Sequence, residues 1–249
     1  MTLRTLRGLL PVALVLALWQ VFGDKESVSA PPPSVWWSAF TTIRQSGAWW
    51  PALGTTLRLF VTGLTLATAL GVLLGGALGA SQRLNRALNP VLEFIRATPA
   101  AAVVPAALLL FHASARTEVG IIVYGSIWPV LLNTAAGRAA LPAIRLEMAR
   151  SLRLSTGERW RKVVLPSLLP DIVVGIRVAA PVCLIVTLLV DFLVATGGLG
   201  YVLVMYQQSF QVSSAFALLA TIGGVGIVIN LLIGGAERLI LRRWPAQRG

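Results

Sequence analysis

Six predominantly apolar stretches run through the chain, and they constrain its fold more than any other feature. We expect them at about Leu9–Phe22, Leu57–Ala80, Thr98–Phe111, Val119–Ala136, Ile172–Ala195 and Phe216–Ala236. A helix crosses the apolar layer of a bilayer with about 20 residues. The chain has 249 residues, 56% hydrophobic and only 12% charged, which leaves room for six crossings and their loops. We therefore predict an all-α membrane protein with about six transmembrane helices.

Two of these stretches have unusual features. The first is short and follows Arg4 and Arg7, so it is either an uncleaved anchor, which we favour, or a signal peptide. The third carries Pro99 and Pro105 and is short for a span. Irregular backbone at membrane depth is tolerated where it is packed in protein or lines a cavity. We expect one of these surroundings for the third stretch.

Two local patterns accompany the first crossings. Three prolines at 31–33 precede a segment with four of the eight tryptophans, which favour the lipid–water boundary. This segment is either an interfacial helix or an outside loop with aromatic anchors. In the second stretch, Gly71, Gly75 and Gly79 have the spacing that lets helices approach closely, a weak indication of dimerisation.

The basic residues predict the orientation. Six crossings put both termini and the loops expected at about 83–96 and 137–170 on one side, and 16 of the 21 basic residues lie there. The positive-inside rule therefore predicts that both termini are cytoplasmic. Topology thus accounts for the net charge of +12. A nucleic-acid binder would need a basic face on a soluble fold, so we expect no nucleic-acid partner.

The segment 137–170 interrupts the apolar pattern with seven basic residues. Apolar residues recur in it at steps of four, as is typical of a helix: Ile144, Met148 and Leu152. Ser155 and Glu158 fit a capping box that begins a second helix, and Pro166 is expected to end it. Each Arg at the bilayer centre costs about 2.5–3.5 kcal/mol on insertion scales, which excludes the segment from lipid. We predict a cytoplasmic loop of two short helices meeting near residue 155.

Part of this loop carries a family motif. Glu147-Met148-Ala149 followed by Leu165-Pro166 resembles the EAA loop of ABC-importer permeases, the inner-membrane components of binding-protein-dependent transport. Three motifs elsewhere resemble the sulfonate, nitrate and taurine branch: Arg96-Ala-Thr-Pro99 with Pro105, Trp128-Pro129-Val-Leu-Leu-Asn133-Thr134, and Gly197-Gly198-Leu199-Gly200-Tyr201. The likeness extends from about Pro31 to Trp244.

The resemblance implies the permease fold of a type I importer. It places the permease domain at 31–244. We expect an N-terminal transmembrane anchor and linker at 1–30 and a tail at 245–249. In such permeases the EAA loop is the coupling helix that docks on a cytoplasmic ATPase. This implies a coupling role for Glu147, Met148, Ala149, Arg153, Gly157, Leu165 and Pro166. Possible pathway or gate residues are Asp191, Arg177, Asn133 and Pro99.

The chain contains no G-x-x-x-x-G-K-[ST] phosphate loop, because neither Lys25 nor Lys162, its only lysines, follows such a pattern. We therefore expect no enzyme and no catalytic, cofactor-binding or metal-ligating residue in this chain. ATP and Mg would be bound by a partner ATPase dimer. The resemblance further implies a second permease copy, identical or different, and a periplasmic or lipid-anchored binding protein. It places the chain among the lipids of the bacterial inner membrane, which it crosses several times.

The implied substrate is a small solute such as a sulfonate, taurine, nitrate or a similar anion. Related permeases leave a vitamin precursor or an aromatic compound as an alternative. A less favoured reading, an ion-coupled secondary transporter, would place carboxylates near mid-membrane and tend to show inverted repeats. An intramembrane enzyme would need a nucleophile–base pair or a metal cluster, and the chain has one His and one Cys.

Two residues depart from the family pattern. Met148 takes the place of the second Ala, and Arg153 that of the loop glycine. An Arg with left-handed backbone costs about 1–2 kcal/mol relative to Gly. We therefore expect the turn to shift, with Gly157 four residues later, or to be carried by Ser155.

Two charged residues, Arg177 and Asp191, fall within the fifth stretch. Asp191 lies 20 residues after Asp171, which corresponds to about 30 Å of helix. If Asp171 marks the cytoplasmic edge, Asp191 lies near the outer edge, where it lines an outer gate or has a structural role. Arg177 is about 9 Å along and is expected to snorkel to the cytoplasm. Assistance to anion passage is the less favoured role for Arg177.

Overall fold

The computed structural model describes residues 3–24, 27 and 29–243, so the predicted tail 245–249 lies outside the described residues. Its helices are α1 (Leu3–Phe22), α2 (Trp36–Gln45), α3 (Trp49–Ala80), α4 (Gln82–Ala97), α5 (Ala100–Phe111), α6 (Ala115–Ala139), α7 (Ala143–Ser151), α8 (Thr156–Arg159), α9 (Leu165–Val194), α10 (Leu199–Gln208) and α11 (Val212–Arg243). A 3₁₀ turn, Pro33–Val35, precedes α2, and a π-helical turn, Trp160–Val164, joins α8 to α9.

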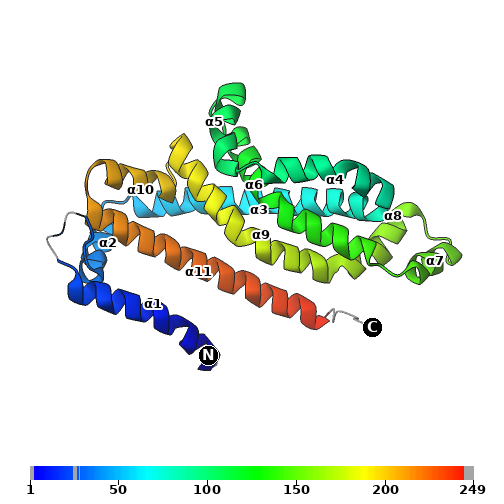
Figure 1. Cartoon of the computed structure of the whole chain (residues 1–249), viewed down its shortest axis with the longest axis horizontal. Helices are drawn as coiled ribbons and strands as arrows, with labels where there is room; N and C mark the ends of the chain where they lie inside the picture. The colour runs from blue at the N-terminus through cyan, green and yellow to red at the C-terminus, as the bar shows by residue number, and fades with distance from the viewer. Residues whose placement is uncertain (1–2, 25–26, 28, 244–249) are drawn as a thin grey trace.

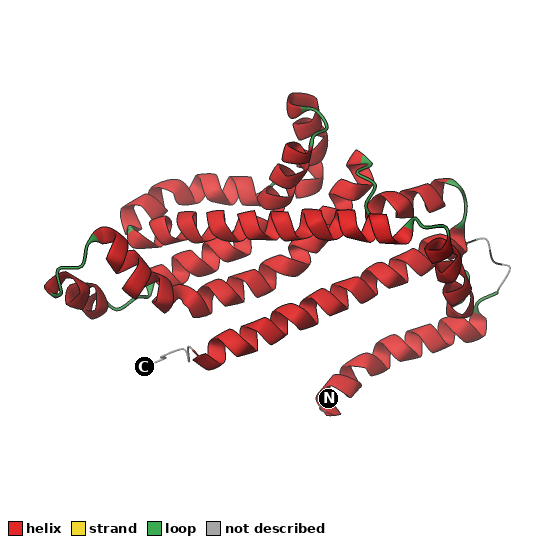
Figure 2. Cartoon of the chain, turned by 180° about the vertical axis from the view of Figure 1, so that it is seen from behind, coloured by secondary structure: helices red, strands yellow, loops and turns green. Residues whose placement is uncertain are grey.

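Long helices make up the body of the molecule, and the predicted all-α fold is confirmed. Figures 1 and 2 show α3, α6 and α9 in the bundle, with α11 and then α1 along one side. Among the described residues, four helical runs are long and apolar enough to cross a membrane, or five if the bent pair α4–α5 counts as one crossing. The first predicted stretch corresponds to a shorter apolar helix, Leu10–Phe22. The short helices α7 and α8 lie at one end of the bundle, and α2 and α10 at the other.

Glycines bring α3 close to α6. A Cβ atom on Gly71 would lie 2.9 Å from the Cβ of Val130, and one on Gly79 would lie 2.7 Å from the Cβ of Arg138. Lipid tails are as apolar as the helix surfaces, so close packing of small residues is a main source of attraction between helices in a membrane. The glycine spacing that weakly indicated dimerisation therefore serves packing within one chain.

The helix α9 completes the central group against α6. Gly175 lets α9 approach the backbone of α6, since a Cβ there would lie 2.9 Å from the Cα of Val130. Gly137, near the end of α6, packs on the carboxylate of Asp171. The largest buried apolar residues between the central helices include Leu59, Phe60, Ile121, Ile122, Leu184 and Val190.

The segment expected as a loop at 83–96 is instead most of the helix α4. Its apolar side chains recur with helical spacing, but Pro90 and three arginines interrupt the pattern. The helix ends at Thr98, and α5 leaves at 90°. Figure 1 shows α5 standing out from the bundle.

The first half of the tryptophan-rich segment forms the helix α2, and Trp49 and Trp50 begin α3; the predicted position of this segment at the membrane interface stays a prediction. Ile43 of α2 is fully buried, in a cluster with Trp49 and Leu218. Trp36 stacks on Phe216 of α11 with ring centroids 5.9 Å apart. One face of α2 therefore packs on α11, so the helix is part of the fold as well as a surface element.

Candidate functional site

The loop 137–170 contains two short helices that meet near residue 155, as predicted. The capping box is present at the start of α8. The Oγ of Ser155 accepts the N–H of Glu158 at 3.3 Å, and Glu158 Oε2 accepts the N–H of Ser155 at 3.1 Å. Lys162 forms an ion pair with Glu158 at 2.8 Å. These contacts satisfy backbone donors that a helix start leaves without intrahelical partners.

Arg153 itself carries the left-handed turn, with φ of 52°. The expectation that the turn shifts towards Gly157 or Ser155 is therefore wrong. Arg153 N–H donates to the Arg150 carbonyl at 2.8 Å, and Leu154 N–H donates to the Ala149 carbonyl at 3.1 Å. This pair of bonds is a Schellman motif, which satisfies carbonyls at the end of α7. The bonds offset the steric cost of about 1–2 kcal/mol that a side chain has in this conformation.

The two faces of α7 differ in what they contact. Ala149, the last residue of the EAA-like triplet, is 1% exposed. The apolar side chains at steps of four point outward, with exposures of 60%, 59% and 71% for Ile144, Met148 and Leu152. Glu147 is exposed beside them. The departure at Met148 therefore fits its position, since an outward side chain is not limited in volume by the core.

Side-chain contacts attach the loop to the long helices. Trp160 packs on α3 at Gly76, where a Cβ would lie 2.5 Å from the ring. Arg145 of α7 donates to the hydroxyl of Ser167 in α9 at 3.3 Å. Trp160 and Leu146 also contact the buried cluster around Leu168. These contacts join α7 to α9 and the π-helical turn to α3.

The second loop helix does not end before Pro166, contrary to our prediction. Helical structure runs without a break from Thr156 to Val194 through the π-helical turn Trp160–Val164. A proline inside an α-helix lacks an N–H and clashes with the carbonyl four residues earlier, here that of Lys162. The wider π-helical turn makes room for the ring and keeps the chain helical. Leu165 and Pro166 thus form the first turn of α9.

Asp191 is fully buried at the end of α9 remote from the loop. Its carboxylate accepts the hydroxyls of Thr56 at 2.5 Å and Thr196 at 2.6 Å. Thr56 in turn accepts the N–H of Leu199 at 2.8 Å. The group therefore joins α3, the end of α9 and the start of α10. Of the two roles considered for Asp191, this geometry favours the structural one, because the residue is fully buried and both of its carboxylate oxygens accept hydroxyl groups.

The other predicted pathway residues lie in separate places. Arg177 pairs with Glu237 of α11 at 2.7 Å, with 58% of the Arg177 side chain exposed. Asn133 donates to the Pro129 carbonyl of its own helix at 2.8 Å. Pro99 is the cap residue of α5. The structure does not gather these residues into one site. Glu237, just past the predicted end of the last stretch, was not predicted as the partner of Arg177.

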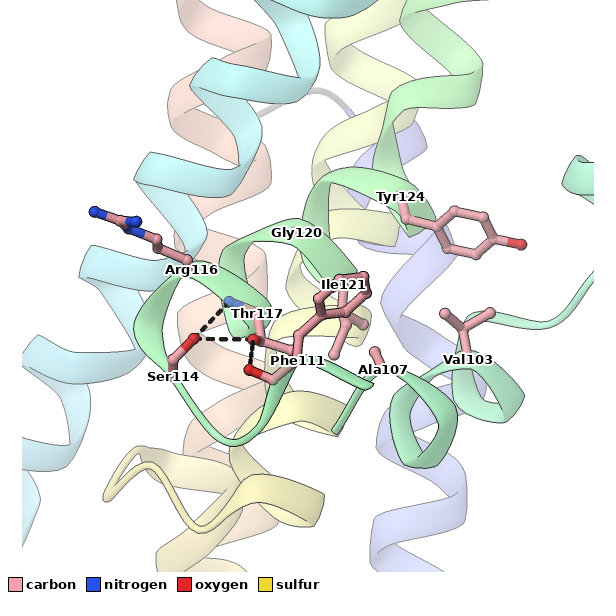
Figure 3. A pocket seen from close by; sticks show the side chains of 9 residues that line it. All are labelled: Val103, Ala107, Phe111, Ser114, Arg116, Thr117, Gly120, Ile121 and Tyr124. Atoms are coloured by element: carbon pink, nitrogen blue, oxygen red, sulfur yellow. Dashed lines mark hydrogen bonds between the residues drawn. The ribbon is translucent and has the colours of Figure 1, made fainter. Parts of the chain in front are cut away.

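A hollow of about 570 Å³ lies between α5 and α6. Val103 and Ala107 line it from α5, and Ile121 and Tyr124 line it from α6 (Figure 3). Ser114 caps α6 at one end of the hollow, where its Oγ accepts the N–H of Thr117 at 3.2 Å. A cavity was one of the two surroundings expected for the third stretch, but α6 was not predicted as its partner helix, because the hollow depends on the 90° bend before α5.

Comparison with known proteins agrees with the loop geometry. Residues 67–244 match the family described as binding-protein-dependent transport system inner membrane component. The chain belongs to this family. It is therefore a permease of the ABC-importer class, a transport protein that crosses the inner membrane several times, and the predicted resemblance is confirmed.

Curated relatives are similar to this permease over nearly the whole chain. The putative aliphatic sulfonates transport permease protein SsuC of Bacillus subtilis is 29% identical, over 95% of this chain and 87% of that protein. The bicarbonate transport system permease protein CmpB of Synechococcus elongatus is 30% identical, over 94% of this chain and 90% of that protein. The taurine transport system permease protein TauC of Escherichia coli is 26% identical, over 94% and 87%.

Solved structures share the fold of the permease. A chain of the inward-facing MetNI methionine ABC transporter superimposes with a TM-score of 0.64 at 15% identity, covering 76% of this chain and 94% of that chain. A chain of an amino acid ABC transporter, solved with histidines, superimposes with a TM-score of 0.62 at 20% identity, covering 82% of this chain and 97% of that chain. These likenesses show the fold alone.

Proposed function

We propose that this permease forms the translocation pathway of an ATP-driven importer for a small anion delivered by a separate binding protein. The names of its relatives support an anion, because they include aliphatic sulfonates, bicarbonate and nitrate. A vitamin precursor or an aromatic compound is the alternative substrate class. The observation that carries the proposal is the exposed apolar face of α7, held on a loop that is attached to α3 and α9.

In this proposal α7 is the docking helix for a cytoplasmic ATPase. The exposed Ile144, Met148 and Leu152 side chains enter a groove of the ATPase, with Glu147 at their side. Closure of an ATPase dimer around ATP and Mg displaces α7. The contact of Trp160 with Gly76 then passes this displacement to α3. The permease itself supplies no catalytic group.

The remaining parts of the assembly follow from the same proposal. Two permease chains, most simply two copies of this one, form the pathway between them. The loop 137–170 and both termini lie in the cytoplasm, in agreement with the distribution of basic residues. A periplasmic or lipid-anchored binding protein docks on the opposite side.

Reconstituted transport tests the proposal. The permease is placed in vesicles with its ATPase and binding protein, and ATP-dependent uptake is measured for a panel of sulfonates, taurine, nitrate and bicarbonate. Uptake of at least one anion that needs both ATP and the binding protein is expected. Uptake driven by an ion gradient without the ATPase would contradict the proposal.

A charge reversal tests the docking helix separately. We expect Glu147→Lys to uncouple ATP hydrolysis from uptake or to stop assembly with the ATPase, while membrane insertion stays intact. The matched control is Glu93→Lys, the same change at an exposed position on α4. Arg159→Ala should have a smaller effect than Glu147→Lys. Native uptake by the Glu147→Lys variant would refute the docking role.

A further inference from the structure

The bend between α4 and α5 lacks one of the hydrogen bonds that would keep the helix continuous. In an α-helix the carbonyl of Ile95 would accept the N–H of residue 99, but Pro99 has no N–H. Thr98 N–H reaches the Ile95 carbonyl at 3.2 Å, and Thr98 itself is extended. The Ile95 carbonyl therefore has one backbone donor and a second lone pair free for another, and the carbonyl of the extended Thr98 lies between the two helices.

Tyr124 of α6 supplies this donor. Its hydroxyl lies 2.8 Å from the Ile95 carbonyl oxygen and 3.1 Å from the Thr98 carbonyl oxygen. The ring is held edge-on to Trp128, with centroids 6.4 Å apart. Figure 3 shows Tyr124 on the same side of the α5–α6 hollow as Val103 of α5. One side chain thus joins α6 to both sides of the bend.

The same helix leads to the docking loop. Fifteen residues separate Tyr124 from Ala139 at the end of α6, which corresponds to about 22 Å of helix. Gly137, in the last turn, packs directly on Asp171 of α9. A tilt or shift of α6 at its loop end therefore moves Tyr124 relative to α4 and α5.

We propose that Tyr124 is a positioning residue that ties the α4–α5 bend to α6, so that movement of the loop 137–170 reaches α5. The inference rests on the proposed docking of an ATPase on this loop. Because α5 forms one wall of the hollow, its movement changes the shape of that hollow during the transport cycle. Tyr124 contacts no substrate in this scheme and acts through the two carbonyls.

The test uses the complete transporter with Tyr124→Phe, which keeps the ring and removes the donor. Cysteines replace Phe94 on α4 and Leu109 on α5, both strongly exposed, and carry spin labels. Native Cys183 is fully buried and can remain in place. The distance between the labels is measured without nucleotide and with trapped ATP. Tyr206→Phe on α10 is the matched control.

With the native side chain and with Tyr206→Phe, trapped nucleotide should shift the distance between the labels. With Tyr124→Phe this shift should disappear and uptake should fall roughly tenfold, in line with the loss of one part-buried hydrogen bond. Basal ATP hydrolysis should stay unchanged. A nucleotide shift that persists in Tyr124→Phe, or that is absent from a native transporter with active uptake, would overturn the proposal. Failure of the native chain to bind the ATPase would instead refute the proposed function.

A second variant keeps the proposal testable if Tyr124→Phe does not assemble. Pro99→Ala restores an N–H at residue 99 and relaxes the restriction on Thr98. In a continuous helix the Ile95 carbonyl accepts the N–H of residue 99 and the Thr98 carbonyl accepts that of Ala102. The bend that Tyr124 holds is then removed. The nucleotide-dependent shift should again be lost, and a native shift in Pro99→Ala would contradict the role of Tyr124.

Discussion

A methyl group added at Gly75 tests the packing of α3 on α6. The new Cβ would fall on the carbonyl oxygen of Leu131 and lie 3.0 Å from the Cβ of Thr134. These atoms belong to or adjoin the backbone of α6, so no side chain can rotate away to relieve the clash. The two helices must separate by several tenths of an ångström or more.

The magnitude follows from the cost of overpacking. Inserting a methyl group into a well-packed interface costs about 1–3 kcal/mol. For a chain of this size we expect the melting temperature to fall by roughly 2–10 °C. Gly54→Ala is the matched control, because it lies in the same helix and a Cβ there meets no atom within 4 Å. That control should be neutral or slightly stabilising, since Ala favours a helix over Gly.

The assay is thermal unfolding of both variants in lipid nanodiscs, combined with uptake by the reconstituted transporter. Gly75→Ala should melt at a lower temperature than the native chain. It should also transport more slowly, because α3 contacts Trp160 of the loop 137–170 and α6 leads into that loop. Equal melting temperatures for Gly75→Ala and Gly54→Ala would refute the packing argument.

Three further substitutions probe other contacts. Asp191→Ala should lower the free energy of unfolding by about 1–3 kcal/mol, because the buried Thr56 hydroxyl loses its acceptor. Asp191→Asn should lower it less, and equal melting temperatures for Asp191→Ala and the native chain would contradict this. A double-mutant cycle on Arg177 and Glu237 should give a coupling of only about 0.5–1 kcal/mol, because the Arg177 side chain is 58% exposed; a coupling several times larger would show that this pair is shielded from water. Arg153→Gly should slow hydrogen exchange in α7, because Gly relieves the left-handed strain, and should leave ATP-dependent uptake unchanged. Faster exchange in α7 would mean that the Arg153 side chain stabilises the turn.

Local patterns were enough to predict most of the fold. The apolar stretches and the capping box at Ser155 depend on residues close together in sequence, so their signals are visible without a structure. Even the departure at Arg153 could be recognised, although the sequence did not show that Arg153 would adopt the left-handed conformation itself. Pro166 was misjudged because a π-helical turn, which leaves no clear sequence signature, accommodates its ring.

The contacts that sequence reasoning missed join residues far apart in the chain. Thr56 and Asp191 are 135 residues apart, and nothing in either neighbourhood identifies the other. The same holds for Tyr124 and Ile95 across the bend, and for Trp160 against Gly76. Such pairs are defined only once the helices have packed. A single sequence therefore indicates the loop that we propose as the docking site of the ATPase, but not the contacts that join this loop to the long helices.

Cross-linking of α7 to the ATPase tests the central claim most directly. Met148→Cys places a reactive group on the exposed face of α7, and Leu109→Cys is a control on α5, which lies away from α7 and where the side chain is even more exposed. In the assembled transporter we expect a short bifunctional reagent to link position 148 to the ATPase, with a yield that changes when ATP is trapped, and to leave position 109 unlinked. Absence of a link at 148 in a transporter that still takes up substrate would contradict the account.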